Sequence, residues 1–197
     1  EVVGTRGALD VVCAVPGKKP VTVRASHLLV ATGRAPNTAG LGLEQAGVQM
    51  NERGAIVVNE RLATSNPHIY ALGDVTGRAP FAHAAKREAF ILAENLLHGG
   101  KRTMPFDAVP WAVFCSPVIA GIGLSEEKAQ ARGITYAVQR AEFVRAGRAT
   151  IIGKQEGFLK VLYEQKNRKL LGAFAVGSRA DDIIHEFVAF MYMNATI

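Results

Sequence analysis

The sequence is poor in cysteine and lacks a long apolar run. Only Cys13 and Cys115 occur among 197 residues, and their separation excludes a disulfide framework, a cysteine-based zinc site and a local C-x-x-C redox pair. Two scattered thiols are typical of a reducing, cytoplasmic setting. Because both lie in apolar runs, we expect them to be buried packing residues. No apolar run reaches the roughly 18 residues that span a bilayer, so we expect no membrane partner.

A starting methionine and a signal peptide are also missing. Residues 1–4 contain no basic segment that leads into an apolar stretch. The last residues, 194–197, follow directly on an apolar helical pattern. These features predict that the chain is a fragment of a longer protein.

Charge of one sign is not concentrated anywhere in the chain. The 23 Lys and Arg residues exceed the 17 Asp and Glu residues, for a formal charge of +6, but the basic residues are dispersed and lack interleaved aromatics. This distribution indicates solvated faces with some attraction for anionic ligands such as nucleotides, and no nucleic-acid partner. The 49% hydrophobic content is typical of a folded globular protein.

The first half of the chain predicts short strands and one long helix. Residues 8–15 and 21–25 form an expected β-hairpin. Residues 28–31 and 69–72 are short apolar runs, which predict strands buried on both faces. Apolar residues at three- and four-residue steps predict a helix over 82–98, closed by the glycines that follow.

The pattern changes after a linker at 101–110. Strands are expected at 111–115, 118–123, 134–143, 149–153, 157–164 and 170–176, with the last two forming a hairpin. Ser125 is expected to cap a short helix, and Asp181 or Asp182 to cap a final one. Locally joined strands with two helices predict an α+β domain with a largely antiparallel sheet, beginning near residue 102.

Gly73 and Asp74 are the first candidates for chemistry, because they end a predicted buried strand. Ligands of open α/β sheets bind beyond the carboxyl ends of strands, and an aspartate there offers two acceptor oxygens to the hydroxyls of a sugar or sugar alcohol. The helix that starts eight residues later would aim free N–H groups and its positive end at the same crevice. A plain structural turn at Gly73, and a His83 satisfied by local backbone or solvent, remain as alternatives.

Several motifs in order resemble the flavoprotein disulfide reductases, the class I pyridine nucleotide-disulfide oxidoreductases. Residues 31–37 read A-T-G-R-A-P-N, and residues 64–75 read T-S-N-P-H-I-Y-A-L-G-D-V. Residues 81–88 are similar to the L-A-H-x-A-x-x-E segment that follows in this family. Residues from Val109 onward resemble the start and continuation of its dimerisation domain.

The resemblance implies an enzyme in which electrons pass from NAD(P)H to FAD, then to a cysteine pair, then to a small-molecule disulfide or a metal ion. It implies that Asp74 accepts hydrogen bonds from the FAD ribityl chain and that residues 80–83 line the flavin. It also implies that backbone at Gly33 approaches the nicotinamide cofactor and flavin. The cofactor-binding residues expected on this basis are Gly33, Gly73, Asp74, Pro80, Phe81, Ala82 and His83, with no catalytic residue and no metal ligand.

The same resemblance implies a fold of α/β plus α+β type in three parts. Residues 1–40 would be the end of the NAD(P)-binding domain and 41–101 the last segment of the FAD-binding domain. Residues 102–197 would be a dimerisation domain that lacks its C-terminal end and forms a homodimer.

Several motifs of the family are missing from these residues. The first G-x-G-x-x-G for FAD, the redox C-x-x-x-x-C, the glycine-rich NAD(P) motif and the terminal catalytic His and Glu do not occur, and we interpret His185-Glu186 as a surface pair. The isolated chain is therefore expected to be inactive. A dihydrolipoamide dehydrogenase-like member is favoured. The alternatives are a mercuric or glutathione reductase-like member, or a non-catalytic dimerisation or binding module with a vestigial FAD motif.

Overall fold

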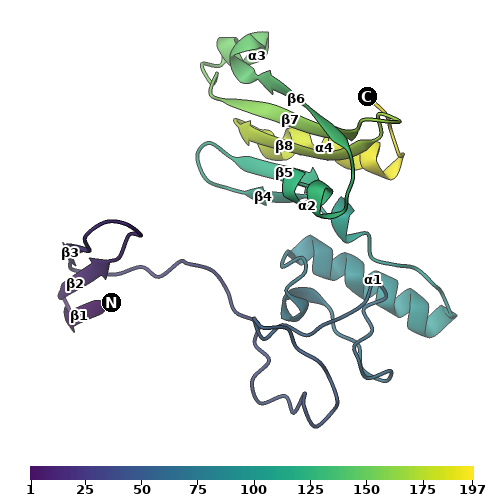
Figure 1. Cartoon of the computed structure of the whole chain (residues 1–197), viewed down its shortest axis with the longest axis horizontal. Coiled ribbons are helices and arrows are strands. Elements are labelled where there is room, and N and C mark those ends of the chain that lie inside the picture. The colour runs from purple at the N-terminus through teal and green to yellow at the C-terminus, as the bar shows by residue number, and fades with distance from the viewer. The chain divides into compact units, whose positions relative to one another are not determined.

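A computed structural model describes all residues from 1 to 197. The chain forms two compact units, Glu1–Ala35 and Pro36–Ile197, which we describe one at a time. Figure 1 labels their helices and strands.

The unit Glu1–Ala35 is built on a three-stranded antiparallel sheet. Its strands β1 (Val2–Thr5), β2 (Ala8–Cys13) and β3 (Val21–Ala25) pair in the order β1-β2-β3. The predicted hairpin is confirmed as β2 and β3, and Arg24 lies opposite Asp10 with Nε 3.2 Å from its carboxylate. All four residues of β1 are exposed, so this sheet is not the interior layer of a core.

Two predictions for this unit are wrong. Residues 28–31 form no strand, and Leu29 and Val30 are 88% and 72% exposed. A strand buried on both faces needs hydrogen-bonded neighbours, and the three strands of this unit pair only with one another. Cys13 is exposed rather than buried, because it ends a strand of a single-layer sheet.

The first part of the second unit, residues 36–110, is mostly irregular backbone around one helix. Helix α1 (Ala82–His98) matches the predicted 82–98 and ends at Gly99, which adopts the left-handed conformation (φ 66°) and donates its N–H to the Glu94 carbonyl. The predicted strand at 69–72 is wrong, since only an isolated bridge joins Tyr70 to Ala63. A fully buried Leu62 centres a small apolar core instead.

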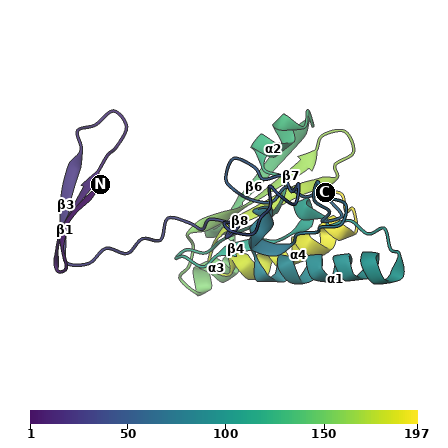
Figure 2. The ribbon, with the colours of Figure 1, turned by 90° about the horizontal axis from the view of Figure 1, so that it is seen from below.

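The second part of this unit is a five-stranded antiparallel sheet, which confirms the predicted α+β type. Its strands pair in the order β4-β5-β8-β7-β6 and are β4 (Trp111–Val113), β5 (Ile119–Gly123), β6 (Tyr136–Glu142), β7 (Gly157–Glu164) and β8 (Leu170–Gly177). Helix α4 (Ala180–Tyr192) runs along one face of the sheet (Figures 1 and 2). Ile122 and Ile184 are buried between them and form the centre of the core.

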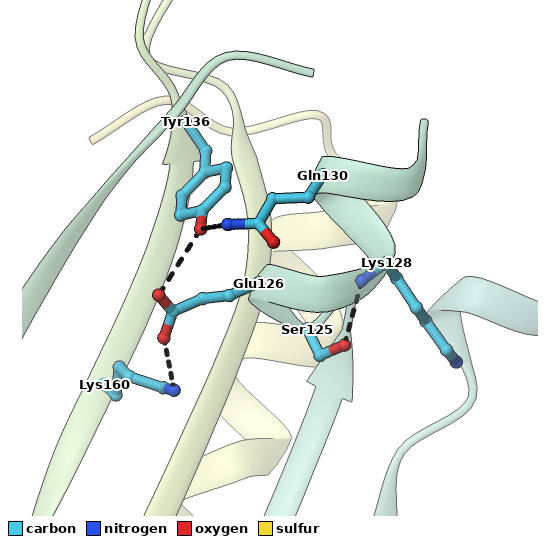
Figure 3. Close-up of polar contacts among 6 residues, drawn as sticks. All are labelled: Ser125, Glu126, Lys128, Gln130, Tyr136 and Lys160. Carbon is cyan, nitrogen blue, oxygen red and sulfur yellow. Dashed lines mark hydrogen bonds and ion pairs between the residues drawn. The ribbon is translucent and has the colours of Figure 1, made fainter. Parts of the chain in front are cut away.

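Helix α2 (Glu126–Ala131) is tied to the sheet by polar contacts (Figure 3). The predicted cap is confirmed, because the Lys128 N–H donates to Ser125 Oγ at 3.3 Å. The Glu126 carboxylate accepts from Lys160 Nζ at 2.8 Å and from the Tyr136 hydroxyl at 3.5 Å. The bond from Lys160 lowers the pKa of Glu126.

Three predictions in the C-terminal half are wrong. Residues 149–153 are not a strand, since helix α3 (Gly147–Ile151) occupies most of them. The cap of α4 is Arg179 in the left-handed conformation, and the two aspartates follow in the first turn, where they face the positive end of the helix. Cys115 is exposed because it lies in the loop between β4 and β5, where its Sγ donates to the Pro117 carbonyl at 3.1 Å.

None of the helices has both the length and the apolar character that crossing a membrane requires.

Candidate functional site

The Gly73–Asp74 pair begins a short 3-10 turn, Gly73–Thr76. Gly73 is buried with a φ of +76°, a conformation that favours glycine. Asp74 follows it as an exposed residue. Within the turn, the Thr76 hydroxyl donates to the Gly73 carbonyl at 2.9 Å and the Gly77 N–H donates to the Asp74 carbonyl at 3.0 Å. The sequence therefore places a carboxylate on the outer side of a turn whose backbone is internally bonded.

The turn lies against the beginning of α1. A Cβ added to Gly73 would stand 3.5 Å from the Cβ of Ala85, in the first turns of the helix. The segments that the sequence placed in one crevice are thus in contact, although the strand expected before Gly73 does not form.

The beginning of α1 has no capping side chain. Phe81 occupies the N-cap position and makes no side-chain bond to the helix. The first N–H groups of an α-helix have no intrahelical acceptor, and the side chain at the cap position supplies none to Ala82, His83 or Ala84. A 17-residue helix therefore presents its first N–H groups and its positive end beside the Asp74 turn. Such donors suit an acceptor-rich or negatively charged ligand.

The His83 imidazole is directed at the chain that leads into the five-stranded sheet. Its Nε2 lies 2.8 Å from the Pro110 carbonyl oxygen, and its ring stacks on Phe81 with 5.5 Å between centroids. A cavity of about 510 Å³ opens beside these residues, with Ala82, Trp111 and His185 among its lining. The helix start and the dimerisation-like part of the chain therefore share one concave surface.

Glu88 is the last residue of the motif at 81–88, and the sequence alone assigns it no role; in the structure it links α1 to the Gly73 turn. Its side chain is fully buried, and its Oε2 accepts from the Gly73 N–H at 2.5 Å. Burial raises the pKa of Glu88, while the Gly73 bond and the nearby Arg78 oppose that rise. The Glu88 Oε1 atom is buried without a hydrogen-bond partner.

Arg78 is a second residue that sequence reasoning missed. Its guanidinium carbon lies 3.6 Å from the centroid of the Phe106 ring, and Nη1 is 3.4 Å from the Val58 carbonyl oxygen. A cation over an aromatic face is a favourable contact. Arg78 thus holds the loop that leads to the exposed Pro80 against the linker.

Gly33 belongs to the unit Glu1–Ala35. It is exposed with a φ of +131°, and an added Cβ would meet no atom within 4 Å. Its conformation, rather than a lack of space, therefore requires glycine.

No group of three or more His, Cys, Asp or Glu side chains is arranged to hold a metal ion. His185 and Glu186 are both exposed in the middle of α4.

Comparison with known proteins assigns the family. The pyridine nucleotide-disulphide oxidoreductase model matches residues 1–89, and the model of the dimerisation domain of the same proteins matches residues 109–197. The chain belongs to the pyridine nucleotide-disulphide oxidoreductases. The resemblance stated from the motifs is confirmed, and the family, together with its flavoprotein members, implies the use of FAD and NAD(P).

Relatives with different names match the chain about equally well. A dihydrolipoyl dehydrogenase of Thermus scotoductus is 41% identical over 184 residues, which are 93% of this chain and 40% of the relative. A mercuric reductase of Streptomyces lividans is 41% identical over 162 residues, 82% of this chain and 34% of the relative. The HOCl-induced flavoprotein disulfide reductase of Escherichia coli has a solved structure that is 30% identical, with a TM-score of 0.77 over 99% of this chain and 44% of its own. The chain therefore spans about two fifths of the length of such relatives.

Proposed function

We propose that this chain is part of an FAD-dependent NAD(P)H:disulfide oxidoreductase of the dihydrolipoamide dehydrogenase type. Residues 1–40 would end the NAD(P)-binding domain, 41–101 would be the last segment of the FAD-binding domain, and 102–197 would be the dimerisation domain. The observation that carries this proposal is the contact between the Asp74 turn and the start of α1, which has no capping side chain. This contact has a cofactor-binding meaning because the chain belongs to the pyridine nucleotide-disulphide oxidoreductases.

Each residue at this site has a role that its geometry supports. The Asp74 carboxylate would accept hydrogen bonds from the ribityl hydroxyls of FAD, while Gly73 keeps a side chain out of the approach. The N–H groups of Ala82 and His83 and the positive end of α1 would face the flavin and stabilise negative charge there, with Pro80 and Phe81 beside them. When bound, FAD would supply two-electron transfer between NAD(P)H and a cysteine pair that these 197 residues do not contain.

The remaining parts of the proposal concern partners. Backbone at Gly33 would approach the nicotinamide cofactor and the flavin. The enzyme would work as a homodimer through residues 102–197, in the cytoplasm, on a small-molecule disulfide or a metal ion. The isolated chain, without the cysteine pair and the nicotinamide motif, is expected to show no NAD(P)H-dependent reductase activity.

A mercuric reductase-like member is the second candidate, because the Streptomyces lividans relative is 41% identical. A glutathione reductase-like member or a non-catalytic module with a vestigial FAD motif would share the same fold. A complete reading frame with G-x-G-x-x-G followed by C-x-x-x-x-C would support an enzyme over the module.

The test is the affinity of the full-length protein for FAD, measured by flavin fluorescence on adding FAD to apoprotein. Losing a buried hydrogen bond costs about 1–3 kcal/mol, so Asp74→Ala should weaken binding roughly tenfold or more. Asp74→Asn, which keeps one acceptor oxygen, should lie between this variant and the wild type. Asp10→Ala, which removes an exposed aspartate of the first unit, is the matched control. An Asp74→Ala protein with unchanged FAD affinity would contradict the assignment.

A further inference from the structure

We propose that Glu88 is a positioning residue for the cofactor: its buried carboxylate fixes the Gly73–Asp74 turn and thereby aims Asp74. This inference rests on the proposed function for the ligand that Asp74 meets. The clamp between Glu88 and Gly73 is itself a feature of this chain.

The contact joins two residues that are 15 positions apart in the sequence and belong to different elements. Glu88 lies on α1, is fully buried, and accepts from the Gly73 N–H through Oε2 at 2.5 Å. Because Gly73 and Glu88 are both buried, loss of this bond would leave a buried N–H without its partner, which is costly. The donor belongs to the residue directly before Asp74, so a change in this bond acts on the carboxylate through a single peptide unit.

Asp74 lies between two tethers to other elements. On its N-terminal side, the Gly73 N–H is held by Glu88. On its C-terminal side, the Val75 carbonyl accepts from the Ile56 N–H at 3.0 Å. The other bonds of the turn, at Thr76 and Gly77, are internal to it and do not fix its place against α1. Removal of the Glu88 acceptor would therefore leave the internal bonds of the turn in place but remove its hydrogen bond to α1.

Burial of Glu88 is energetically unfavourable in one respect, which an apolar side chain at this position would avoid. Its Oε1 is buried with no partner, and an unsatisfied buried polar atom is unfavourable. Arg78 lowers and Asp74 raises the pKa of this carboxyl, so both are near enough to interact with it electrostatically. Glu88 thus interacts electrostatically with Asp74, the proposed ribityl contact, and with Arg78, which lies further along the same loop.

The first experiment observes the clamp on the 197-residue chain without any cofactor. In ¹⁵N-labelled protein, the Gly73 amide proton should resonate downfield in the wild type and move upfield in Glu88→Ala. Glu88→Gln, which keeps an acceptor oxygen, should restore part of the downfield shift. Glu94→Ala and Glu94→Gln, on the same helix, are the matched controls and should leave the Gly73 amide unchanged. If the chemical shift of the Gly73 amide proton is the same in the wild type and in both Glu88 variants, the hydrogen bond from Gly73 to Glu88 is not present and the inference is wrong.

The second experiment measures FAD affinity of the full-length protein in a double-mutant cycle. Glu88→Ala should weaken binding about tenfold, Glu88→Gln by less, and Glu94→Ala not at all. If Glu88 acts through Asp74, the double variant Asp74→Ala/Glu88→Ala should bind no more weakly than Asp74→Ala alone. A general loss of structure would instead give additive losses, which would overturn the positioning role.

The outcomes separate this inference from the proposed function. If Asp74→Ala weakens FAD binding but Glu88→Ala and Glu88→Gln do not, the positioning role is wrong and the proposed FAD site stands. If Asp74→Ala leaves FAD affinity unchanged while the Gly73 amide shift changes in the Glu88 variants, the hydrogen bond between Glu88 and Gly73 is confirmed but its role in cofactor binding is wrong. If Glu88→Ala fails to fold, Glu88→Gln tests the inference in its place. A Gly73 amide shift and an FAD affinity equal to those of the wild type would then contradict the positioning role.

Discussion

The Nε2 atom of His83 lies 2.8 Å from the carbonyl oxygen of Pro110. A carbonyl oxygen only accepts, so Nε2 carries the hydrogen and donates it. This bond joins the first turn of α1 to the residue directly before β4. The start of the helix that we propose to face the flavin is thus fastened to the five-stranded sheet by one imidazole.

His83→Ala should loosen this connection. The hydrogen bond is expected to contribute about 0.5–1.5 kcal/mol to the free energy of unfolding, and the loss of the stack on Phe81 adds to that effect. Urea unfolding of the chain, followed by the fluorescence of its single tryptophan, Trp111, should report a lower midpoint. His98→Ala, at the other end of α1, is the control at a pH where histidine is neutral. Equal midpoints for the two variants would contradict the role of the bond.

The ion pair between Glu126 and Lys160 predicts a pH-dependent contribution to stability. The bond from Lys160 lowers the pKa of Glu126 below its ordinary value of 4.5. A carboxyl whose pKa is lower in the folded state stabilises the fold above the unfolded pKa, and loses that contribution as the pH falls through the folded pKa. The free-energy difference between wild type and Glu126→Gln should therefore be present at neutral pH and vanish in acid.

The size of this effect is limited by solvent, since the two side chains are 41% and 30% exposed. Exposed pairs contribute about 0.2–1 kcal/mol, and we expect a value in that range at neutral pH. Glu127→Gln is the matched control, because Glu127 shares the first turn of α2 and the helix dipole but has no ion-pair partner. A Glu126→Gln effect that stays constant from neutral pH to acid would contradict the linkage.

The sequence predicted correctly those helices whose start, end or apolar period is determined by residues within or next to the helix. The helix at 82–98 has an apolar period and a glycine at its end, and Ser125 caps α2 as its position indicated. The runs at 28–31 and 69–72 failed for the opposite reason. A strand exists only through hydrogen bonds to neighbours, and the apolar character of a run does not say whether neighbours are present.

The candidate site was predictable in part. The motif around Asp74 and the start of α1 indicated which segments meet, because a helix start and a Gly-Asp pair each have chemical signals in the sequence. The clamp from Glu88 to Gly73 was not predictable, since it is a tertiary contact made by a side chain that lies on the buried face of α1. Likewise, nothing in the sequence shows that Arg78 lies over Phe106.

The structure shows which apolar residues of the predicted dimerisation domain are exposed to a partner and which are buried. Ile122 is fully buried beneath α4 and offers no surface to a partner. Phe187 and Met191 also pack partly against that core. Phe190 and Tyr192, on opposite flanks of α4, remain exposed by 43% and 53%. These exposed aromatics of α4, rather than the sheet face beneath the helix, are therefore where a second copy should pack.

The last prediction follows from that surface. Exposed aromatic side chains are enriched at interfaces, and the matched family model describes a dimerisation domain. The full-length protein should therefore be a dimer by light scattering at micromolar concentration. An anchor residue at an interface contributes about 2 kcal/mol or more, so Phe190→Asp should weaken association roughly 30-fold. Val57→Asp, at an exposed valine outside residues 102–197, is the control and should remain dimeric. A wild-type protein that is monomeric at this concentration would refute the homodimer, whereas a dimeric Phe190→Asp variant would move the interface away from α4.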